Sequence, residues 1–166
     1  MTTKQLETKT FPTRIDIDEK VRKDLIAKLN LTLCTAIDLQ SQLKQAHWNV
    51  KGPNFIQLHE MFDEFAGEIT GYVDMMAERV TTLGGLALGT TRVAAANSLL
   101  DEFPVEATNE KEILNALADR YATFAKHIRK EIDATDKLGD ADTADLYTEI
   151  SRTIDMRLWF IESHLH

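Results

Sequence analysis

The chain has 166 residues, 43% of them hydrophobic, which is enough for one domain with a buried core and excludes an intrinsically disordered chain. With only seven glycines and three prolines it lacks the turn residues of an all-β fold, and it has no apolar run of membrane-spanning length. The net charge of −8 favours cations over nucleic acid as partners. Residues 1–15 depart from this, because three basic side chains and one acidic side chain give them a net charge of +2.

Hydrophobic residues recur at helical spacing in four long segments. The first covers about 18–49, with Asp16 or Asp18 as its N-cap. The residues Lys51-Gly52-Pro53 end it.

The second segment follows Asn54, which we expect to cap a helix together with Gln57 in a capping box. Gly84-Gly85 ends this helix. The long connection 86–108 comes next, and we expect a short helix at 92–96 inside it.

The third segment begins after Asn109, with Glu112 as its capping-box partner, and Gly139 closes it in a left-handed cap. The fourth begins near Asp140 or Asp142.

Four helices joined by two short links and one long link predict an all-α fold, a four-helix bundle with the ferritin-like crossover connection. A short helix lies in the long connection between the second and third long helices. We expect residues 16–166 to form this domain and residues 1–15 to form a flexible arm. The single cysteine, Cys34, cannot form an internal disulfide, and the N-terminus lacks the apolar segment of an export signal, so we expect a cytoplasmic protein.

Two histidines and three carboxylates share a pattern that favours a metal site. His59 and Asp63 are four residues apart on the second helix, as are Asp74 and Glu78, and all four lie on one stripe of that helix. His47 lies at the end of the first helix and can fold back beside His59. Each residue alone is typical of an ordinary surface or core position. Together they suit a first-row divalent ion, Fe(II), Zn(II) or Mn(II).

One chain cannot bring this set together. Asp63 and Asp74 are eleven residues apart, or about 16 Å along a helix, whereas ligands lie about 2–2.5 Å from their ion. If two chains pair through antiparallel second helices, the early cluster of one meets the late cluster of the other. We therefore predict two equivalent metal sites shared across a two-fold axis.

The chain resembles the Dps family, the small ferritin-like proteins named for protecting DNA in starved cells. The resemblance covers nearly the whole chain and is densest in KQAHWNVKGPNFIQLHEMFDEF (residues 44–65) and DMMAERVTTLGG (residues 74–85). Three shorter stretches also match: GLALGTT (85–91), LADRYA (117–122) and LWFIE (158–162).

The resemblance implies a dodecameric shell built from two-fold dimers, each with ferroxidase centres between its subunits. It implies that His47, His59 and Asp63 bind iron from one subunit and that Asp74 and Glu78 bind it from the other. The implied reaction oxidises two Fe(II) ions per centre to Fe(III), with hydrogen peroxide preferred over dioxygen, and stores ferric mineral. Zn(II) is an expected competitor.

The resemblance also marks residues around this centre. Trp48 matches the family's tryptophan beside the site. Core packing and electron donation are both possible roles of this side chain, and one does not exclude the other. An acidic turn joins the third and fourth helices. In a shell of this type the turn lines the pore that admits iron, and Asp142 and Asp145 are the best candidates for pore residues. Singly, its residues are typical of a solvated helix junction; they are Glu131, Asp133, Asp136, Asp140, Asp142 and Asp145.

Three histidines lie outside the centre. His127 is expected to be ordinary, and His164 with His166 form a frayed tail or an additional metal site.

Two other functions remain open. The first is a nucleoid-associated protein that binds DNA without sequence preference through Lys4, Lys9 and Arg14 of twelve arms. The second is a metal buffer that holds zinc at the same site without catalysis.

Overall fold

The computed structural model describes Leu6 and residues 8–166. Within them the chain forms five helices: α1 (Glu19–Asn49), α2 (Phe55–Thr82), α3 (Thr91–Asn97), α4 (Glu110–Lys137) and α5 (Ala141–Ser163). The only β-type pairing in this part is an isolated bridge between Lys51 and Asn109. The prediction of an all-α fold with a short helix in the long connection is confirmed.

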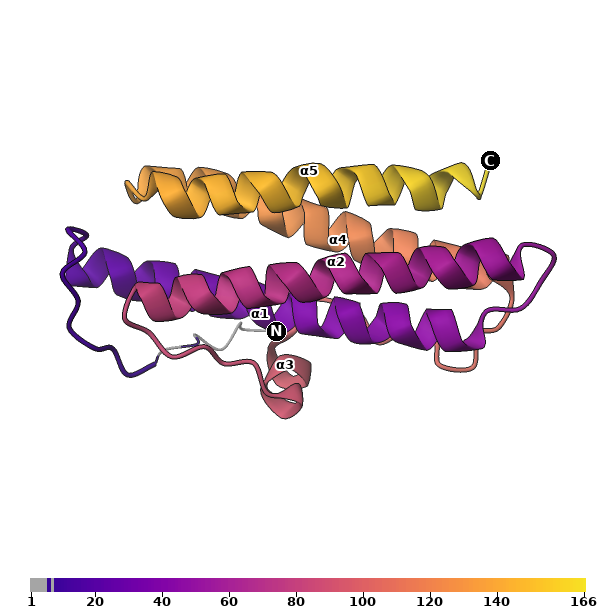
Figure 1. The fold of residues 1–166 in the computed structure, drawn as a ribbon, viewed down its shortest axis with the longest axis horizontal. Coiled ribbons are helices and arrows are strands. Elements are labelled where there is room, and N and C mark those ends of the chain that lie inside the picture. The colour runs from indigo at the N-terminus through magenta and orange to yellow at the C-terminus, as the bar shows by residue number, and fades with distance from the viewer. Residues whose placement is uncertain (1–5, 7) are drawn as a thin grey trace.

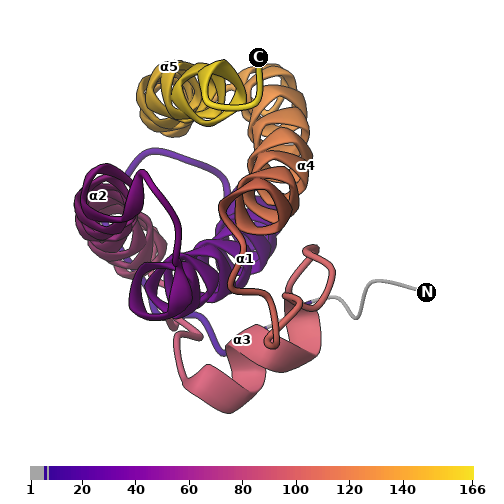
Figure 2. The ribbon, with the colours of Figure 1, turned by 90° about the vertical axis from the view of Figure 1, so that its right-hand side faces the viewer.

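The four long helices form a bundle around one core (Figure 2). α1 packs mainly against α2, and α4 packs mainly against α5. The connection from α2 to α4 runs back along the bundle, so that α4 runs parallel to α2, and it carries α3 on the outer side of α1 (Figure 1). None of the helices among the described residues is both long and apolar enough to cross a membrane.

Local signals set most of the helix ends. The carboxylate of Asp18 accepts a hydrogen bond from the Lys20 N–H at 2.8 Å, and the Asn109 side chain accepts hydrogen bonds from two N–H groups of α4. Asp140 caps α5 in the same way, and Gly139 has the positive φ of 83° that a left-handed cap requires. The predicted bounds of α1 and α4 and the predicted start of α5 are therefore confirmed. Among the described residues the Glu112 side chain returns no hydrogen bond to the Asn109 N–H, so only the Asn109 half of that predicted capping box forms.

The predicted capping box at Asn54 and Gln57 is wrong. The Asn54 side chain accepts no capping hydrogen bond, and Glu110 instead of Gln57 accepts from the Asn54 backbone N–H. The Asn54 backbone N–H and side-chain amide donate to the Glu110 carboxylate at 2.6 and 3.1 Å. The first turn of α4 thus holds the start of α2 in place.

The N-terminal segment contacts the rest of the chain through both side chains and backbone. Leu6 packs against Cys34 and Ala94, and the Phe11 N–H donates to the Gly84 carbonyl at 2.7 Å. Gly84 has φ +85°, and a Cβ there would lie 2.6 Å from the Phe11 carbonyl oxygen, so only glycine fits. Lys4 and Glu7 of the predicted arm, with residues 1–3 and 5, lie outside the described residues. The flexibility of the arm remains a prediction.

Candidate metal centre

His47 and His59 form a stacked pair at one end of the bundle. His47 lies in the last turn of α1 and His59 in the second turn of α2, and the link between the helices folds them together. Their ring centroids are 3.8 Å apart, with 21° between the planes. The prediction that His47 folds back beside His59 is confirmed.

Reciprocal hydrogen bonds orient both rings. Nδ1 of His47 lies 2.7 Å from the His59 carbonyl oxygen, and Nδ1 of His59 lies 2.8 Å from the His47 carbonyl oxygen. Because a carbonyl only accepts, each Nδ1 carries the proton. In the neutral rings each Nε2 then has a free lone pair, and a backbone bond at the other nitrogen is how metal-binding histidines are commonly held.

Asp63 has a partner that the sequence analysis missed. Its carboxylate is 57% exposed and pairs with the ammonium of Lys44. The hydrogen bond from Lys44 lowers the pKa of Asp63 below its usual range, and the charge of Lys44 adds to this. Lys44 lies one turn before His47 and Trp48 on α1, which was the signal available in the sequence. A metal ion at Asp63 must compete with this ammonium.

Trp48 is 66% exposed, and the Lys44 ammonium lies 5.7 Å from its ring centroid. Core packing within one chain is therefore the wrong interpretation of Trp48. Its redox role remains a prediction.

Asp74 and Glu78 are exposed further along α2, beyond the histidine pair. Within the part of the chain that the structure describes, neither carboxylate forms an ion pair, and no three His, Cys, Asp or Glu side chains come close enough together to hold a metal ion. The structure thus brings the two histidines together and leaves the carboxylates apart.

The acidic turn divides into buried and exposed carboxylates. Asp140 is buried and accepts two hydrogen bonds from Arg79, at 2.8 and 2.9 Å. Burial disfavours its charged form, but the hydrogen bonds from Thr143 and Arg79 outweigh burial and lower its pKa. Asp140 is therefore not a solvated residue. Asp142 and Asp145, the predicted pore residues, are exposed.

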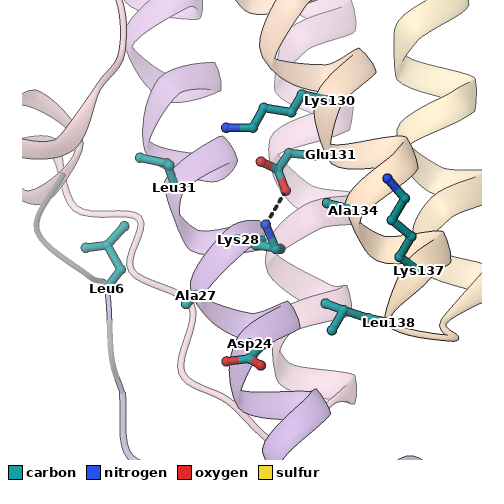
Figure 3. A pocket seen from close by; sticks show the side chains of 10 residues that line it. All are labelled: Leu6, Asp24, Ala27, Lys28, Leu31, Lys130, Glu131, Ala134, Lys137 and Leu138. Carbon is teal, nitrogen blue, oxygen red and sulfur yellow. Dashed lines mark hydrogen bonds and ion pairs between the residues drawn. The ribbon is translucent and has the colours of Figure 1, made fainter.

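Glu131 is also buried, and it lies within α4 rather than in the turn itself. A cavity of about 540 Å³ opens between α1 and α4, and the Glu131 carboxylate accepts a hydrogen bond from Lys28 there at 2.9 Å (Figure 3). His127 bonds to Thr32 at 2.8 Å behind this pair, and burial lowers its pKa. These residues form a structural polar network in the bundle.

The two C-terminal histidines and the single cysteine differ in exposure. His164 and His166 are exposed at the C-terminus. Cys34 is buried, and burial raises the pKa of its thiol to about 11, which makes it a poor nucleophile.

Known proteins share this architecture. A family model described as a ferritin-like domain matches residues 26–166. The DNA protection during starvation protein of Agrobacterium fabrum is 41% identical over 157 residues, which cover 95% of this chain and 97% of that protein. The corresponding protein of Mycolicibacterium smegmatis is 34% identical over 90% of this chain and 81% of its own length.

Solved structures agree with these sequence matches. DpsA14 from Streptomyces coelicolor superposes with a TM-score of 0.91 at 31% identity, covering 96% of this chain and 95% of that one. The tetragonal form of Mycobacterium smegmatis Dps gives 0.88 at 33% identity, covering 97% and 95%. The chain therefore belongs to the Dps family of ferritin-like proteins.

Proposed function

We propose that this protein is a ferroxidase that removes Fe(II) from solution and stores it as ferric mineral inside a dodecameric shell. The observation that carries the proposal is the incomplete centre. The end of α1 and the start of α2 together present two oriented imidazole nitrogens, and the later part of α2 presents two carboxylates without ion pairs in the described chain. One chain cannot join these two groups. A second chain related by a two-fold axis supplies the missing ligands.

The residues suit Fe(II) as a substrate that must leave after oxidation. His47, His59 and Asp63 of one chain hold iron together with Asp74 and Glu78 of the other. Mixed imidazole and carboxylate ligands bind first-row ions without thiolate. The exposed carboxylates allow ferric product to pass to the mineral.

The reaction balances with peroxide as oxidant. Two Fe(II) ions each give one electron to one hydrogen peroxide molecule, which takes up two protons and becomes two water molecules. Since both electrons arrive at one centre, no hydroxyl radical is released. When only one iron is bound, the exposed indole of Trp48 supplies the second electron and is itself oxidised to an indole radical.

The test is anaerobic loading with Fe(II), followed by hydrogen peroxide, with ferric absorbance recorded over time. The double variant His47→Ala with His59→Ala should lose rapid oxidation. The matched control His164→Ala with His166→Ala removes two exposed histidines and should oxidise iron at the wild-type rate. Equal rates in all three proteins would contradict the proposal. A wild type that binds Zn(II) but does not oxidise iron would favour a metal buffer instead.

DNA binding is a second candidate function. The relatives are named for DNA protection, and Lys9 and Arg14 are exposed on the N-terminal segment. Twelve weak, salt-sensitive contacts can add to a measurable affinity. A gel shift at low salt, with and without residues 1–14, tests it, and an unchanged shift after the deletion would exclude the arm.

A further inference from the structure

The cavity between α1 and α4 has a largely aliphatic surface. Its volume of about 540 Å³ lies within the range of pockets that hold small molecules. Half of its ten lining residues have aliphatic side chains and none is aromatic; the aliphatic residues are Leu6, Ala27, Leu31, Ala134 and Leu138. A surface without rings offers no stacking partner to a planar ligand, so it favours a linear hydrocarbon chain.

Cationic groups outnumber anionic groups around this cavity. Three lysines and two carboxylates line it, which gives one net positive charge within a chain of net charge −8. The buried Glu131 carboxylate is already engaged, because it accepts a hydrogen bond from Lys28 at 2.9 Å. Lys130 forms no ion pair in the described part of the chain, and its side chain extends above the Lys28–Glu131 pair toward α1 (Figure 3). An ammonium is therefore available to an anion at this end of the cavity.

The opposite end of the cavity carries no net charge. α1 and α4 run antiparallel, so Asp24 of α1 lies at the end away from Lys130 (Figures 1 and 3). Lys137 lies seven residues after Lys130, about 10 Å along the helix, and balances the charge of Asp24. An anionic group is thus favoured beside Lys130, and an uncharged chain is favoured toward Leu138.

Lys28 can assist Lys130 in holding an anion. Its side chain is 31% exposed, and an ammonium has three N–H donors, of which the bond to Glu131 uses one. A cationic ligand is disfavoured, because Glu131 is already paired and Lys130 would repel it. The segment 1–5, which precedes Leu6, has Lys4 as its only charged side chain, so it too lacks the charge that this end favours.

We propose that the cavity binds one free medium-chain fatty acid per chain. The carboxylate lies at the ammonium groups of Lys28 and Lys130, and the hydrocarbon chain lies along the aliphatic surface toward Leu138. Lys130 and Leu138 are eight residues apart, about 12 Å along α4, which is close to the length of an extended ten-carbon chain. The site is separate from the proposed iron centre, because it shares no residue with that centre.

Calorimetric titration of the assembled protein with sodium decanoate, below its micelle concentration, tests the proposal. Binding should saturate at one decanoate per chain. Octanoate and hexanoate should bind successively more weakly, by about fourfold for each methylene removed. Acetate, which lacks the chain, and 1-decanol, which lacks the charge, should both bind more weakly than decanoate.

Three variants locate the site. Lys130→Met should weaken decanoate binding about fivefold, as expected for one exposed ion pair. Ala134→Phe should abolish binding by filling the cavity. Lys126→Met is the matched control, because Lys126 is exposed on the same helix outside the cavity and should leave the affinity unchanged. All three variants should oxidise iron at the wild-type rate, and helix content reports their folding.

Several results would overturn the proposal. These are an absence of saturable binding, equal affinities for decanoate and 1-decanol, and an unchanged decanoate affinity in Lys130→Met. If Ala134→Phe does not fold, Lys130→Met and the chain-length series still decide. Binding to phosphatidylglycerol vesicles without binding of free decanoate would indicate a membrane surface instead. Dissociation of the assembled protein by decanoate would show that the cavity is an interface between copies of the chain.

Discussion

Lys44 gives the sharpest test of how the centre is charged. The early end contributes one positive charge from Lys44 and one negative charge from Asp63, and the late end contributes two negative charges from Asp74 and Glu78. The complete centre therefore has a formal charge of −2 with neutral histidines, which becomes −3 when Lys44 is replaced by methionine. The methionine keeps the apolar stem that lies near Trp48.

The iron that Asp63 holds should respond most. In wild type it must displace the ammonium from Asp63, whereas in Lys44→Met the carboxylate is free. One unit of charge beside a metal ion at a solvent-exposed site changes affinity by about tenfold. We expect the Fe(II) ion held by Asp63 to bind about tenfold more tightly in Lys44→Met than in wild type.

An anaerobic calorimetric titration with Fe(II) measures this directly. Lys51→Met is the matched control, because Lys51 is exposed just beyond the end of α1 and forms no ion pair in the described part of the chain. Identical Fe(II) affinities for wild type and Lys44→Met would refute the view that Lys44 competes with iron.

Three further predictions concern the rest of the fold and the pore. Lys28→Met should cost about 2 kcal/mol and about 4–8 °C of melting temperature, because it leaves Glu131 buried without its partner; adding Glu131→Met should recover most of this loss in the same melts. Asp142→Asn with Asp145→Asn should slow iron uptake at low Fe(II) but not oxidation at high Fe(II), and unchanged stopped-flow uptake would exclude the pore. Asp140 has a lowered pKa, so the stability that it adds is complete above about pH 4 and is lost as pH falls through its folded pKa. Urea titrations of Asp140→Asn and wild type should therefore differ at pH 7 and converge in acid.

Features whose causes lie close together in the chain were predictable. The helical period and the caps at Asp18 and Asn109 act within four residues, so they define α1 and α4 without tertiary information. The stacking of His47 on His59 followed from a short link that folds one helix against the next.

Features that depend on contacts between residues far apart in the chain could not be predicted from local sequence. The Gln57 half of the predicted capping box is absent because Glu110, 56 residues away, accepts from the Asn54 backbone N–H in its place. The Asp140 carboxylate looked solvated because its partner, Arg79, lies 61 residues away. Lys44 was passed over because its pairing with Asp63 depends on how α1 and α2 face each other.

The central claim is that each metal centre is shared between two chains, and subunit mixing tests it most directly. Chains carrying His47→Ala and His59→Ala are co-expressed in equal amounts with chains carrying Asp74→Ala and Glu78→Ala. Neither alone should oxidise iron. In random pairing, half of the dimers are mixed and each holds one intact centre of two, so the mixture should recover about one quarter of the wild-type rate. A mixture that stays as inactive as its separate components would contradict the claim.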